Sequence, residues 1–153
     1  MEELKVATEN DTTQYIVIKI GEEQYGINIA YIDNIVRMQH ITRVPKVQSY
    51  LKGVINLRGI IVPVMSLRLK MGLEDDQITK ATRIIILKLE SAGIIGIVVD
   101  EVKEVITLEN SQVEKVSAEN TSPDHVNFVQ NVGKYGEELI SILDLNAVAM
   151  EKE

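Results

Sequence analysis

The feature of this sequence that most constrains its fold is an internal repeat of about 70 residues. Residues 16–20 (IVIKI) match residues 85–89 (IILKL) at an offset of 69, and residues 26–29 (GINI) match residues 96–99 (GIVV) at an offset of 70. A unit of this size is marginal alone, so two of them should share a packed interface. The alternative is that β-rich segments resemble each other by chance.

The aliphatic composition predicts what kind of unit is repeated. The chain has 21 Ile and 18 Val against 12 Leu and 7 Ala. β-Branched side chains suit pleated surfaces and lose rotamer freedom in helices. This bias favours an all-β protein over a helical bundle, and about 70 residues of short strands are enough for one small closed barrel.

Local patterns predict several elements within the repeats. Residues 15–20 and 25–29 are expected to form a β-hairpin. Residues 56–59 (NLRG) fit a type I turn that leads into a strand over 60–64. Short helices are expected at 67–71, closed by Gly72, and at 145–150, with an Asp as the N-cap.

Charge is distributed unevenly along the chain. The formal net charge is −7, yet residues 34–73 contain no Asp or Glu and carry seven basic side chains. Such a segment indicates either a surface that meets a polar or acidic partner or a solvated face that happens to lack acids. Nucleic-acid binding is the alternative function for this basic segment, although the acidic chain and a single stacking residue there, Tyr50, weaken it.

The residue types needed for catalysis or metal binding are missing or isolated. The chain has no Cys, and its two histidines, His40 and His125, lie in different halves without the spacing of a metal or catalytic motif. No phosphate-binding loop or nucleophile motif occurs. We therefore expect a binding module with no catalytic residues, no metal and no cofactor. Without a signal peptide or an apolar stretch long enough to span a bilayer, it should be cytoplasmic and not inserted into a membrane.

Two segments carry a resemblance to a known family. The first begins with residues 23–29 (EQYGINI) and continues through Asp33 and Asn34 to residues 42–45 (TRVP). The second is residues 51–64 (LKGVINLRGIIVPV). With residues 96–102 (GIVVDEV), they resemble the CheW family of bacterial chemotaxis, from about residue 14 to the C-terminus. The resemblance implies two packed five-stranded SH3-like β-barrels with short helices, including one at the C-terminus. The predicted division is a flexible tail over 1–13, a first barrel over 14–80 and a second over 81–153, which together form one CheW-like domain.

The resemblance also implies the partners and the site. CheW-family proteins are non-catalytic adaptors that link the cytoplasmic tips of methyl-accepting chemoreceptors to the regulatory domain of the histidine kinase CheA. The family's receptor-contacting patch falls on Ile32, Asn34, Ile35, Gly53, Arg58, Gly96, Val102 and Val105. The family often has an acid at the position of Asn34, where this chain has Asp33 one residue earlier. An ion pair of that acid with the receptor would therefore be shifted or lost. For Arg58, the alternative to a receptor contact is an intramolecular salt bridge that holds its turn. The kinase contacts are expected on strand ends and loops, without named residues.

Overall fold

The structure, a computed structural model, describes residues 11–115 and 128–150. Eleven strands are found in this part of the chain: β1 (Thr12–Ile20), β2 (Glu23–Asn28), β3 (Ile32–Arg37), β4 (Leu51–Leu57), β5 (Ile60–Ser66), β6 (Arg83–Leu89), β7 (Gly93–Val99), β8 (Glu101–Glu109), β9 (Val113–Lys115), β10 (Val129–Tyr135) and β11 (Glu138–Leu143). Short helical segments accompany them: η1 (Ile29–Tyr31), α2 (Leu67–Lys70), η2 (Asn110–Gln112) and α3 (Leu145–Ala149). None of these described helices is long and apolar enough to cross a membrane.

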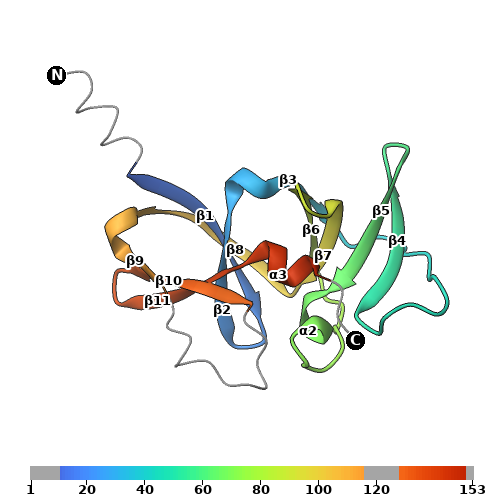
Figure 1. Cartoon of the computed structure of the whole chain (residues 1–153). Coiled ribbons are helices and arrows are strands. Elements are labelled where there is room, and N and C mark those ends of the chain that lie inside the picture. Colours follow the sequence, from blue (N-terminus) through green and yellow to red (C-terminus); the bar gives the residue numbers. More distant parts are fainter. Residues whose placement is uncertain (1–10, 116–127, 151–153) are drawn as a thin grey trace.

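The strands form two sheets that lie side by side (Figure 1). The strand order is β8-β1-β2-β11-β10-β9 in one sheet and β3-β6-β7-β5-β4 in the other. We call the unit formed by the first of these sheets barrel A and the unit formed by the second barrel B. This arrangement confirms the predicted all-β class with two packed units and short helices.

The two repeats exchange strands between the barrels. Barrel A combines β1 and β2 of the first repeat with β8, β10 and β11 of the second, and barrel B combines β6 and β7 with β3, β4 and β5. The register is equivalent in both, because Gly26 pairs with Ile142 in barrel A and Gly96 pairs with Val64 in barrel B. The repeat is therefore confirmed. The barrels, however, are not divided at residue 80, because each hairpin pairs with the later strands of the other repeat.

Each sheet closes on itself. In barrel A, β8 and β9 lie at opposite edges of the strand order but are joined by the three residues of η2, so the two edges meet. In barrel B, the chain after β3 makes a single bridge from Thr42 to Val54 of β4. Five strands were expected in barrel A. The sixth, β9, continues the chain of β8 after the turn at η2.

Alternating side chains build three apolar cores. On β1, Tyr15 and Val17 lie inside barrel A, while Ile16 and Ile18 point the other way into a cluster shared by both barrels. On β6, Ile84 lies inside barrel B and Ile85 joins the same shared cluster. We call this shared cluster the seam. Both faces are buried over residues 15–18 of β1 and 84–87 of β6, and these stretches are therefore continuously apolar.

Both predicted helices are found, and their N-caps are equivalent. The Ser66 hydroxyl accepts a hydrogen bond from the backbone N–H of Leu69, and the Asp144 carboxylate accepts one from Ala147. Gly72, with a φ of 80°, follows α2 as predicted. The predicted tail of residues 1–13 is too long, because β1 already begins at Thr12; its first ten residues lie outside the described part, as does His125.

Candidate partner-binding site

Four predicted aliphatic residues lie on two equivalent strands that border the seam. Ile32 and Ile35 are on β3, and Val102 and Val105 occupy the matching positions of β8. Ile32, Ile35 and Val102 are half-buried against the seam, whereas 54% of Val105 is exposed. We call these four residues the seam surface. Their placement gives equivalent apolar positions from both repeats.

A β-bulge decides where the acidic side chain of β3 points. The pairing with β6 steps from Ile32–Leu87 to Asn34–Ile86, so Asp33 is the extra residue. The Asn34 side chain turns back and accepts a hydrogen bond from the Ile35 N–H at 2.8 Å. An Asp33 carboxylate oxygen lies 3.9 Å from Nη2 of Arg58. In this chain, Asp33 therefore faces the arginine, and Asn34 does not.

Arg58 lies in a tight turn at the end of the β4–β5 hairpin. Leu57 pairs with Ile60, so only Arg58 and Gly59 connect the strands, and both have positive φ angles, 53° and 85°. This is the pattern of a type I′ turn, and the predicted type I turn is wrong. The Arg58 side chain is 70% exposed, so its long contact with Asp33 leaves most of its donors in solvent.

The two glycines of the predicted patch are buried, and their roles are structural. Gly53 has a φ of 145°, and a Cβ there would lie 2.1 Å from the carbonyl oxygen of Thr42. At Gly96, a Cβ would lie 2.9 Å from Cγ2 of Ile84 inside barrel B. Glycine therefore permits close packing at both positions, and any effect on a partner must pass through the fold.

Two exposed apolar side chains were missed by sequence reasoning. Ile61 on β5 is 61% exposed, and Leu139 on β11 is 67% exposed. They are equivalent in the repeat at an offset of 78, so each barrel carries an aliphatic side chain near the end of its outer hairpin. The sequence signal for this pair was that the repeats align Ile61 with Leu139. Such an alignment does not show whether the two side chains are exposed.

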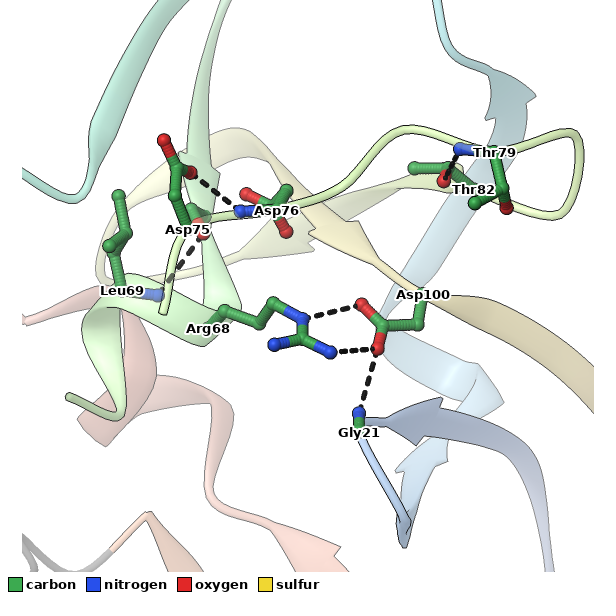
Figure 2. A network of polar contacts seen from close by, with 9 residues as sticks. Gly21, Arg68, Leu69, Asp75, Asp76, Thr79, Thr82 and Asp100 are labelled. Atoms are coloured by element: carbon green, nitrogen blue, oxygen red, sulfur yellow. Dashed lines mark hydrogen bonds and ion pairs between the residues drawn. The ribbon is translucent and has the colours of Figure 1, made fainter. Parts of the chain in front are cut away.

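A polar network ties the two barrels together beside the seam (Figure 2). Arg68 of α2 donates two hydrogen bonds to Asp100, at 2.9 and 2.7 Å, and the Gly21 N–H donates to the same carboxylate at 2.7 Å. The hydrogen bonds from Arg68 hold the pKa of Asp100 below its ordinary value, and Asp100 in turn raises the pKa of Arg68. Both groups are thus charged and paired.

Two adjacent acids in the connector after α2 have opposite environments. Asp75 forms an ion pair with Lys52 at 2.7 Å, and hydrogen bonding from this lysine lowers the pKa of Asp75. Neither oxygen of Asp76 is exposed or accepts a well-formed hydrogen bond within the described part of the chain. Burial raises the pKa of Asp76, although the nearby Ser66 hydroxyl opposes this effect.

The barrels carry opposite net charge. Residues 32–99, which contain every strand of barrel B, have ten basic and five acidic side chains. The remaining described residues, which contain the strands of barrel A, have four basic and eleven acidic side chains. The predicted basic segment therefore belongs to one barrel. In the described residues, no three His, Asp or Glu side chains are grouped so that they could hold a metal ion.

Comparison with known proteins identifies the family. A family profile described as CheW-like domain matches residues 14–153. The chain belongs to the CheW family. It is 37% identical over 138 residues to the chemotaxis protein CheW of Bacillus subtilis, a match covering 90% of this chain and 86% of the relative, and 34% identical to that of Helicobacter pylori, covering 90% and 82%. The scaffolding protein TtCheW from Thermoanaerobacter tengcongensis has a similar crystal structure, with a TM-score of 0.82, 28% identity and coverage of 92% and 97%.

Family membership decides between the predicted functions. CheW-family proteins are non-catalytic chemotaxis scaffolds that couple receptors to the kinase CheA, which favours the adaptor over the nucleic-acid binder. The fold agrees with this result, since each barrel is of the SH3-like type found in the family.

Proposed function

We propose that the seam surface and Arg58 bind the cytoplasmic tip of a chemoreceptor, and that the exposed side chains of Ile61 and Leu139 contact the regulatory domain of CheA. The observation that supports the receptor site most is the equivalent placement of aliphatic pairs on β3 and β8, on both sides of one apolar seam. The protein would act in the cytoplasm, at arrays of membrane receptors.

The chemistry of the seam surface fits a helical partner. A receptor tip is a helical hairpin, and an amphipathic helix presents apolar side chains at intervals of three and four residues. Val105 is the most exposed member and has the most apolar area left to bury. Burying one such side chain completely contributes about 1.5–3 kcal/mol. Arg58 would donate hydrogen bonds to carboxylates or carbonyls at the edge of the same contact.

Two matched substitutions test the receptor site. Val105→Asp should abolish the binding of a soluble receptor-tip fragment, because it places a charge in the apolar contact. Ile78→Asp changes a similarly exposed side chain, 57% exposed in the connector, and should leave binding unchanged. The measurement is titration calorimetry, with circular dichroism to show that both variants fold. Normal binding by Val105→Asp would exclude the seam surface.

The kinase contact is tested at two exposed aliphatic side chains outside the seam surface. Ile61→Asp and Leu139→Asp remove exposed aliphatic area on β5 and β11. At least one of them should weaken binding to the CheA regulatory domain, while the receptor fragment binds as before. If both variants bind the kinase domain normally, these two side chains are not the kinase site.

A further inference from the structure

The two passages of the chain between the barrels are built differently. The chain passes from barrel A to barrel B through η1, where Ala30 lies, and returns to barrel A at Asp100, the equivalent position. In the described part of the chain, the side-chain hydrogen bond at the first passage is a local cap, in which the Asn28 side chain accepts from the Ala30 N–H. At the second, Asp100 binds both Arg68 and Gly21, which belong to different structural units.

The contacts of Asp100 fix the start of β8. Its carboxylate joins α2, which follows β5 of barrel B, to the β1–β2 turn of barrel A. Its backbone N–H also donates to the carbonyl of Lys19 at 3.1 Å. Val102 lies two residues further on and pairs with Ile18 of β1. Val102, the first seam-surface residue on β8, is therefore only two residues from the position that this network fixes.

The equivalent contact in the other repeat is weaker. Asn146 of α3 corresponds to Arg68, and its side chain accepts one hydrogen bond from the Ser91 hydroxyl at 2.8 Å in the β6–β7 turn. This contact is neutral, single and exposed, whereas the Arg68–Asp100 pair is charged, bidentate and about three-quarters buried. The Ser91–Asn146 contact is therefore a matched control for the Arg68–Asp100 network.

We propose that Arg68 and Asp100 are positioning residues for receptor binding, which hold β8 so that Val102 and Val105 align with Ile32 and Ile35 across the seam. Neither residue touches the receptor in this proposal, which rests on the function proposed above. The bidentate guanidinium fixes direction as well as distance, and a lysine at the same place cannot reproduce its planar pair of nitrogen donors.

The test combines a measurement on the free chain with one on the complex. Asp100→Asn and Arg68→Gln should shift the methyl NMR signals of Val102 and Val105, and leave those of Ile55 and Val62 inside barrel B in place. Both variants should bind a soluble receptor-tip fragment about three to thirty times more weakly, the range for mutations that act through packed networks. Arg68→Lys should fall between them and the unchanged chain. Ser91→Ala should change neither readout, and all variants should bind the CheA regulatory domain as before.

Each outcome decides the proposal. Unshifted Val102 and Val105 signals in both Asp100→Asn and Arg68→Gln would overturn it. Shifted signals with unchanged receptor affinity would also overturn it, because the network would then support the fold alone. Equal losses for the receptor fragment and the kinase domain would point to general destabilisation and overturn it. If the unchanged chain does not bind the receptor fragment, the proposed function itself is wrong, whatever the methyl signals show.

Discussion

At the scale of single residues, Arg58 has a backbone conformation that favours glycine or asparagine. A positive φ is costly for most L-residues, and Asn-Gly is the preferred pair for a two-residue hairpin turn. We expect Arg58→Asn to raise the free energy of unfolding by about 0.5–1 kcal/mol in urea denaturation. The same change should weaken receptor binding about tenfold or more, because a charged donor contributes about 1.5–3 kcal/mol.

Lys46 provides the control for this prediction. It also has a positive φ, 61°, but lies in the chain between β3 and β4. Lys46→Asn should add similar stability without changing receptor affinity. If Arg58→Asn gained stability and kept full affinity, the strained turn would have no connection with binding.

The buried carboxyl of Asp76 predicts a pH dependence of stability. Since its pKa is raised in the folded protein, folding favours the protonated form, and the ionised form destabilises the protein near neutral pH. Asp76→Asn should therefore increase the free energy of unfolding at pH 7, by about 1 kcal/mol for an unsatisfied buried group. This gain should shrink towards about pH 4.

Asp75 should behave in the opposite way. Its pKa is lowered by Lys52, so its contribution is present at neutral pH and is lost as the pH falls through the folded-state value. Asp75→Asn should destabilise the protein slightly at pH 7 and not at low pH. Parallel pH profiles for the two asparagine variants would contradict these assignments.

At the scale of elements, β4 has a bulge between Leu51 and Gly53, and this bulge shows why one glycine cannot be replaced. Asn131 occupies the equivalent bulge position of β10, so the bulge alone does not require glycine. Gly53 differs because its Cβ would collide with the Thr42 carbonyl and its φ is positive. We expect Gly53→Ala to lower the free energy of unfolding by about 2 kcal/mol or more, and Asn131→Ala by less than 1 kcal/mol, measured by thermal denaturation. Equal losses of unfolding free energy would show that the bulge itself, and not the close approach to the Thr42 carbonyl, requires glycine.

The strands and short helices were predictable because their signals are local. Alternating β-branched residues, capping side chains and Gly72 each act over a few positions, and the structure confirms those elements. The turn at Arg58 was misassigned because Asn56 and Gly59 fit two turn types, and pairing of Leu57 with Ile60 decides between them. Likewise, the contact between Asp33 and Arg58 depends on a bulge that the sequence pattern does not indicate.

At the scale of the whole molecule, the exchange of strands could not be foreseen from the repeat. Both halves contain all the strand types of one barrel, and equivalent strands offer nearly the same apolar faces to either hairpin. Only the packed molecule shows that β1 and β2 pair with strands of the second repeat. The predicted packed interface between the repeats does not depend on which strands each hairpin pairs with. In either pairing, one apolar face of each hairpin must be buried against the other barrel.

Cutting the chain in the connector between α2 and β6 tests the exchange. Neither fragment, residues 1–77 or 78–153, would contain a complete barrel as a monomer. We expect each fragment to be unfolded or self-associated alone, and the equimolar mixture to recover the β-sheet circular dichroism and the mass of the intact protein in sedimentation. A fragment that folds as a monomer would contradict the exchanged pairing.

The opposite charges of the two barrels make the molecule an electric dipole with its positive pole on barrel B, the barrel that carries Arg58. A negatively charged receptor tip would rotate the approaching protein into alignment before any side chains meet. Added salt should therefore slow the formation of the complex much more than it speeds its dissociation, a difference that stopped-flow measurements resolve.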